Sequence, residues 1–112
     1  MDVNKYNVYI NPIAFDNIKK NIKLIEGRLE VGIFRKIKAN DIVTFICKST
    51  NETVVKKVNK INKYSSFEEL ILNENLKLIL PWCKESDEAV NYYYDLYKKY
   101  KLSKYIVLAI HI

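Results

Sequence analysis

The segment Tyr105–Ile112 constrains the fold most strongly, because it is apolar on both faces of what reads as one extended strand. Side chains of a strand point alternately to opposite faces. One face would carry Ile106, Leu108, Ile110 and Ile112, and the other Val107, Ala109 and His111. Such a strand is buried on at least one face. Since 112 residues leave room for one domain, we expect this strand inside its core.

Alternation and turn signals predict the other strands. They are expected at Val3–Ile10, Lys23–Leu29, Ile42–Cys47 and, after a hairpin turn at Ser49–Glu52, Thr53–Asn62. In the second of these segments Leu24, Glu26 and Arg28 share one side, because strand faces alternate. This places a carboxylate and a guanidinium two residues apart on one face, where they can pair.

Capping residues predict three helices. Asn11 is a strong N-cap followed by Pro12, Ser66 and Glu69 form a capping box, and Ser86 caps the last helix. The inward-facing positions are expected to be Ile13, Ala14, Ile18 and Ile22; Phe67, Leu70 and Ile71; and Ala89, Val90, Tyr93, Leu96, Tyr97 and Tyr100. Hairpin signals without a sustained βαβ repeat predict an α+β domain, either an antiparallel sheet or a small barrel with helices at its ends.

Composition argues against several classes of protein. Cys47, Cys83 and a single histidine, His111, give a zinc cage or a cysteine–histidine pair almost nothing to build with. No apolar run approaches the roughly 20 residues that span a bilayer, and no signal-peptide core follows Met1. We therefore expect a reduced, intracellular protein, cytoplasmic or nuclear, with no metal, no cofactor and no membrane partner.

The net charge of +6 points to a polyanionic partner such as nucleic acid. Nearly all of the basic residues are lysines, since Arg28 and Arg35 are the only arginines. An AT-rich genome would give the same lysine excess without selection for binding. Charge alone leaves both interpretations open.

Several short motifs occur in an order that resembles a known family. Lys23–Arg28 fits K-x-x-E-x-R, Asn40-Asp41 stands before an apolar strand, Tyr64–Leu70 reads Y-x-S-F-E-E-L, Leu80-Pro81 precedes the last helix, and Val107–Ile110 reads V-x-A-I. This pattern resembles the ASCH domain of the PUA-like superfamily over roughly residues 10–112. Asn21 and Asn40 stand where the family has glycine, and asparagine tolerates positive φ well. The resemblance implies a PUA-like β-barrel of about five or six mostly antiparallel strands with about three helices.

The resemblance also implies a cleft between barrel and helices that faces RNA or a nucleotide. Some relatives are amidohydrolases acting on N4-acetylated cytidine, and others are ribonucleases. The amidohydrolases use a lysine, matched by Lys23, a threonine, whose position holds Glu26, and a glutamate, for which Glu85 is the nearest candidate. With one of three roles matched, we expect a binding module for RNA, single-stranded nucleic acid or a nucleotide-like ligand. An enzyme using Lys23 and Glu26 as catalytic residues remains the alternative.

We predict ligand contacts from four parts of the chain. In Lys23, Glu26 and Arg28 the arginine would present its donor fork to a phosphate or base edge, whereas the structural alternative is an ion pair that fixes the strand. The other predicted ligand residues are Arg35 and Lys36 in a basic loop, and Tyr64, Ser65 and Trp82 at loop–helix junctions. Tyr93, Tyr97 and Tyr100 are expected to form a core stripe, with Tyr92 and Tyr94 exposed.

Overall fold

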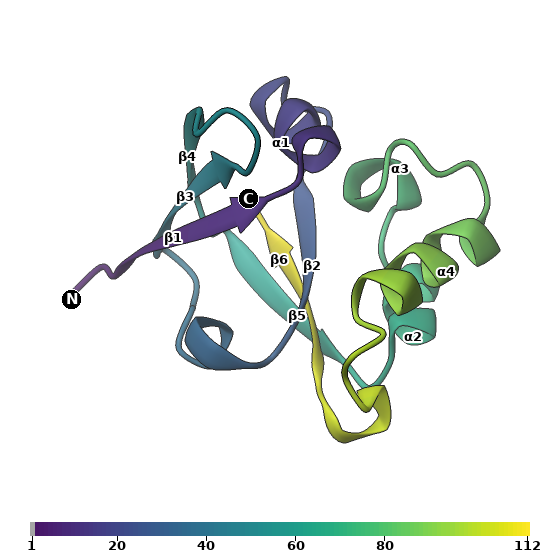
Figure 1. Cartoon of the computed structure of the whole chain (residues 1–112). Helices are drawn as coiled ribbons and strands as arrows, with labels where there is room; N and C mark the ends of the chain where they lie inside the picture. The colour runs from purple at the N-terminus through teal and green to yellow at the C-terminus, as the bar shows by residue number, and fades with distance from the viewer. Residues whose placement is uncertain (1) are drawn as a thin grey trace.

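A computed structural model describes residues 2–112, which form six strands in two three-stranded sheets (Figure 1). The first sheet has the order β1-β3-β4, with β1 (Lys5–Ile10) parallel to β3 (Ile42–Cys47) and β3 antiparallel to β4 (Thr53–Lys57). The second has the order β2-β6-β5 and is antiparallel throughout, with β2 (Ile25–Leu29), β6 (Val107–His111) and β5 (Lys60–Tyr64). The α+β class and the mostly antiparallel pairing are confirmed.

The chain passes from one sheet to the other at Val58 and Asn59. The Val58 N–H donates to the Asp41 carbonyl (2.8 Å) beside β3, whereas the Asn59 N–H donates to the His111 carbonyl of β6 (2.7 Å). The single strand predicted at Thr53–Asn62 is therefore wrong, because these residues form two strands in different sheets. The strand pairs give two separate sheets, and the predicted closed barrel is not confirmed.

Four α-helices and two 3₁₀ turns complete the described chain. They are α1 (Pro12–Lys19), η1 (Gly32–Arg35), α2 (Phe67–Asn73), α3 (Leu76–Ile79), α4 (Ser86–Leu96) and η2 (Leu102–Lys104). Each of these helices is too short or too polar to cross a bilayer.

Two of the three predicted helix caps are confirmed. The Asn11 side chain accepts from the Ala14 N–H (2.9 Å), and the Ser66 hydroxyl accepts from the Glu69 N–H (3.1 Å). The Glu69 carboxylate reaches back to Ser65, from whose N–H and hydroxyl it accepts. The predicted cap at Ser86 is wrong: α4 already includes Ser86, and Glu85 occupies the cap position without a side-chain bond.

Positive backbone φ angles occur where asparagine replaces the family glycines. Asn21 has φ 59° and Asn40 has φ 76°. Both turns therefore form with asparagine, as expected from its tolerance of the left-handed region.

The second sheet separates two hydrophobic cores. One lies between the two sheets and α1, and the other lies between the second sheet and α2, α3 and α4 (Figure 1). The strand β6 serves both, because Leu108 and Ile110 face the first core while Val107 and Ala109 face the second. This explains the two-sided apolar pattern at the C-terminal segment.

The helix faces differ in part from the prediction. Ala14, Ile18, Phe67, Leu70, Ile71, Ala89 and Tyr93 are buried as expected, whereas Ile13, Ile22, Leu96 and Tyr100 are exposed. Phe15, which the pattern did not select, is fully buried. The helix α4 ends at Leu96, so Tyr100 lies beyond the periodic face on which it was placed.

Candidate functional site

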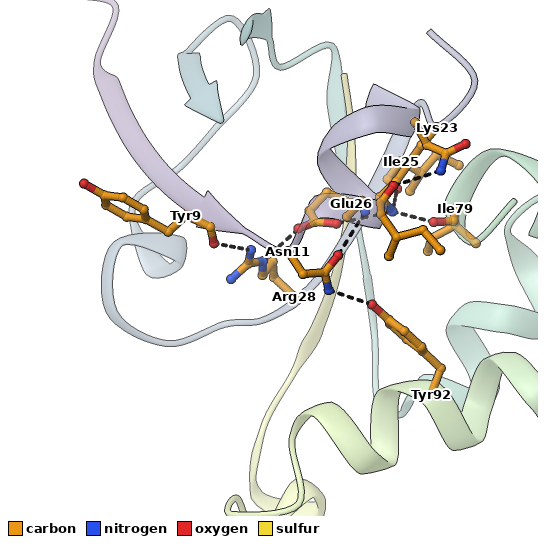
Figure 2. Close-up of polar contacts among 11 residues, drawn as sticks. Tyr9, Asn11, Lys23, Ile25, Glu26, Arg28, Ile79 and Tyr92 are labelled. Carbon is orange, nitrogen blue, oxygen red and sulfur yellow. Dashed lines mark hydrogen bonds and ion pairs between the residues drawn. The ribbon is translucent and has the colours of Figure 1, made fainter. Parts of the chain in front are cut away.

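A cavity of about 210 Å³ lies along the free edge of β2. Its walls come from the C-terminal end of β1, from α1 and its cap, from β2, from the loop around Trp82, and from α4 with the segment after it. Figure 2 shows how β1, β2 and α4 converge there, with Tyr92 projecting from α4 towards Asn11. Four of the predicted ligand residues, Lys23, Glu26, Arg28 and Trp82, line this one cavity.

Lys23 is buried because the turn after α1 directs its side chain inward. The N–H groups of Ile22 and Lys23 both donate to the Asn17 carbonyl (2.9 and 3.0 Å), after Asn21 has reversed the chain. The Lys23 ammonium is 1% exposed and donates to the carbonyls of Ile25 (2.6 Å) and Ile79. Burial lowers the pKa of Lys23, against the opposing effect of Glu26.

Glu26 holds both neighbouring cations. Its carboxylate lies 3.2 Å from Lys23 Nζ and accepts from Arg28 Nε at 3.0 Å. Burial raises the pKa of Glu26, but Lys23 and Arg28 outweigh burial and leave that pKa below its ordinary value. The predicted pairing of Glu26 with Arg28 is confirmed.

The Arg28 guanidinium keeps donor capacity beyond its pair with Glu26. One terminal nitrogen makes a long contact with the Tyr9 carbonyl (3.5 Å), and its central carbon lies 5.0 Å from the centre of the Phe34 ring. Of the described residues that line the cavity, Glu26 is the only acid, whereas Lys23, Arg28 and Lys48 are basic. The cavity is therefore electropositive.

Aromatic rings form the opposite wall. The Tyr92 ring lies edge-on to Trp82 at 5.4 Å, and its hydroxyl accepts from the Asn11 amide (3.0 Å), which links α4 to the α1 cap. Tyr93 and Tyr97 stack on Phe67, at 4.4 and 5.4 Å. The prediction that Tyr92 is exposed is wrong, because this link holds it half-buried. Tyr94 is exposed as predicted.

Three polar atoms in this wall are buried without a partner among residues 2–112. They are the Trp82 indole nitrogen and the hydroxyls of Tyr93 and Tyr97. Burial raises the pKa of Tyr97 to about 12 and that of Tyr93 well above its ordinary value, so both hydroxyls stay protonated. An unpaired buried polar group costs about 1–3 kcal/mol. The site therefore carries three unsatisfied hydrogen-bond donors.

The remaining predicted ligand residues lie elsewhere. Arg35 lines a second cavity of about 440 Å³ with Lys38, Lys60 and Lys63, and Lys36 is exposed beside it. Ser65 lines a third cavity, with Tyr94. The structure does not bring these residues to the cavity along β2.

Tyr64 belongs to a separate polar network around Glu74. The Glu74 carboxylate accepts from the Tyr64 hydroxyl and from the Asn62 amide (2.9 Å), and it lies 2.9 Å from His111 Nε2. Burial and the bond to Glu74 raise the pKa of Tyr64 to about 12. Within the described chain, no three His, Cys, Asp or Glu side chains gather closely enough to hold a metal ion.

Sequence reasoning missed several residues of the cavity. Tyr9, Asn11, Lys48, Tyr92, Tyr93 and Tyr97 all line it. Asn11 carried a signal, but only as a helix cap. The others depend on how β1 and α4 approach the edge of β2, which local patterns do not encode.

The fold and the cavity define a small α+β domain with an electropositive, aromatic-walled site. The ASCH domain model matches residues 8–112, so the chain belongs to the ASCH domain family, which is generally linked to RNA binding. The resemblance seen in the sequence is thereby confirmed.

Two solved structures are similar over nearly the whole chain. A crystal structure of hypothetical protein PH0355 is 34% identical, covers 96% of this chain and 95% of that one, and has a TM-score of 0.84. A solution NMR structure of protein PF0455 from Pyrococcus furiosus is 31% identical, covers 96% and 94%, and has a TM-score of 0.76. No curated protein matches the chain.

Proposed function

We propose that this protein is an RNA-binding module that holds one unpaired or modified nucleobase in the cavity along β2. The observation that carries the proposal is the joint presence of Arg28, held by Glu26, and the aromatic wall of Trp82 and Tyr92 in a single cavity. A guanidinium offers parallel donors to a phosphate or base edge, and aromatic rings stack on unpaired bases. Family membership supports an RNA ligand.

The size of the cavity supports a single base. Its volume of about 210 Å³ is below the roughly 300–1,000 Å³ of sites for drug-sized ligands. Sequence-specific RNA recognition targets unpaired bases in loops and at ends, which can be splayed out and stacked on protein side chains. A base of a single strand fits this site better than a duplex does.

The second cavity supplies a route for the backbone of the same strand. Phe34 lines it and also lies under the Arg28 guanidinium, so the two cavities adjoin through this pair. The basic side chains there include Arg35, Lys38 and Lys60, and Lys36 is exposed nearby. We propose that they contact phosphates, which positions the strand without reading its sequence.

The sharpest test compares the two arginines. Arg28→Lys should weaken binding of a labelled single-stranded RNA about ten-fold, because an ammonium replaces the bidentate donor fork. Arg35→Lys is the matched control, and it should keep the parental affinity because a point charge suffices for a phosphate. Fluorescence anisotropy gives both affinities and thermal melting gives both stabilities. If Arg28→Lys melts lower but binds as the parent does, Arg28 is structural and the proposal fails.

A salt titration tests the backbone contacts separately. The logarithm of the binding constant should fall linearly with the logarithm of the salt concentration, by about 0.7 per phosphate contacted on a single strand. Binding that stays flat between low and physiological salt would exclude the proposed phosphate contacts of the second cavity.

The alternative function is hydrolysis of RNA or of an N4-acetylcytidine-type nucleoside in the same cavity. It is favoured by one observation, the buried Lys23 with a lowered pKa beside a carboxylate, a pattern common in catalytic sites. Against it, the Lys23 ammonium already faces two carbonyls and Glu26. An enzyme should release product from N4-acetylcytidine or RNA, and Lys23→Met should abolish that release. A binding module should release none.

A further inference from the structure

The three unpaired donors in the cavity wall indicate what the site reads. Trp82 Nε1 can only donate, and the hydroxyls of Tyr93 and Tyr97 are buried in protonated form. Natural proteins seldom leave such groups unpaired, so each instance calls for an explanation. Here all three belong to residues that line one cavity, whereas the nearest carboxylate, Glu26, is already engaged by Lys23 and Arg28.

These groups are held in place by rigid packing. Phe67 stacks on both tyrosines, which fixes the directions of their rings. A side chain at Gly27 would overlap the Tyr93 hydroxyl, so the strand position beneath that hydroxyl has to be glycine. The wall is therefore preorganised, and its hydroxyls cannot turn to protein partners without disrupting the second core.

We propose that this donor set reads the carbonyl oxygens of a keto pyrimidine, so that the cavity prefers a uracil-type base to a cytosine-type base. This inference rests on the proposed function and specifies its ligand. Uracil presents two carbonyl oxygens, whereas cytosine replaces one of them with an amino group that also donates. An amino group facing buried donors leaves both sides unpaired, which a site built for hydrogen bonds discriminates against strongly.

Size and charge agree with a neutral single-ring base. A volume of about 210 Å³ equals about seven waters at roughly 30 Å³ each, close to the count of non-hydrogen atoms in a pyrimidine. A phosphate at the same donors would have to shed a much larger hydration shell than a carbonyl. Arg28, whose side chain is 21% exposed, remains available to a phosphate at the mouth.

The test uses uridine and cytidine as probes, which differ in one substituent and stack alike. Calorimetry or NMR titration should show uridine binding about ten-fold more tightly than cytidine to the parental protein. In the double variant Tyr93→Phe/Tyr97→Phe the rings remain but the donors are lost, so the ratio should fall towards one. The same variant should melt at an unchanged or higher temperature, because removing an unpaired buried hydroxyl relieves a cost.

The matched control is Tyr94→Phe. The Tyr94 hydroxyl donates to Glu68, away from the cavity, so this variant should retain the parental ratio. Equal binding of the two nucleosides, or a preference for cytidine, would overturn the keto preference and leave the proposed base-binding function standing. Loss of stability in the double variant with an unchanged ratio would assign the hydroxyls a structural or water-binding role and would also overturn it. If neither nucleoside nor RNA binds the parent, the proposed function itself fails.

Discussion

Two buried carboxylates sit on the second sheet, and they are used in opposite ways. Glu74 accepts from Tyr64 and Asn62 and lies within hydrogen-bond distance of His111, so its network is closed by protein partners. Glu26 is flanked by two cations, Lys23 and Arg28, and the cluster keeps one surplus positive charge. Beside it stand three donors without partners.

The difference separates a structural network from a binding site. A fully satisfied polar network rigidifies the fold and offers nothing to a ligand. The cluster around Glu26 instead retains charge and donors at a cost in stability, a pattern expected where a site is preorganised for a ligand. The comparison predicts that changes at Glu74 alter stability alone, whereas changes around Glu26 alter both stability and binding.

The largest effect is expected from Glu26→Gln. Removing this charge leaves two buried cations without a counter-charge, and breaking such a pair typically costs about 3–5 kcal/mol. Urea denaturation at neutral pH measures the loss. A loss below about 1 kcal/mol would show that the cluster is well solvated and would remove the basis for calling it buried.

Acidification should reproduce part of this effect. The pKa of Glu26 is below its ordinary value of 4.5 in the folded state, so the unfolded chain takes up protons first as the pH falls. Stability from this group is present above about pH 4.5 and is lost as the pH falls through the folded pKa; Glu74 acts in the same direction. Melting temperatures between pH 7 and pH 3 should therefore decline at the acid end, more steeply in the parent than in Glu26→Gln.

Glu74→Gln should cost about 2 kcal/mol, because hydrogen bonds to a charged acceptor are each worth roughly 1.5–3 kcal/mol and the amide retains some of them. Its affinity for single-stranded RNA should equal that of the parent. A drop in affinity without a larger loss of stability would show that the Glu74 network also contacts the ligand, and the contrast with Glu26 would fail.

The smallest effect is expected at a position outside both networks. Ser66→Ala removes the cap that accepts from the Glu69 N–H and should destabilise the protein by about 1 kcal/mol. RNA affinity should not change. This variant measures how far a modest loss of stability alone affects binding, against which the Glu26 and Glu74 variants are judged.

Much of the fold follows from local signals. Asn11 and Ser66 cap helices, and Ile42–Cys47 forms a strand with the predicted bounds. The break at Val58 was missed because valine and lysine continue the alternation past it. The decisive contacts are those to Asp41 and His111, which are distant in sequence.

The candidate site was predictable only where its residues are close in sequence. The two-residue spacing of Glu26 and Arg28 predicts their pairing, since side chains two apart share a strand face. The complete burial of Lys23 was not predictable, because it depends on the Ile79 carbonyl of α3. Tyr92 was assigned to solvent because helical spacing says nothing of the Asn11 amide that holds it.

The most direct test of the central claim follows the indole N–H of Trp82. The chain has one tryptophan, so its indole gives a single, isolated NMR signal in ¹⁵N-labelled protein. On titration with single-stranded RNA or uridine, this signal should shift progressively as the unpaired donor gains an acceptor, with the same midpoint as the anisotropy curve. RNA that binds while the Trp82 signal stays in place would show that the ligand lies elsewhere, and the cavity along β2 would not be the binding site.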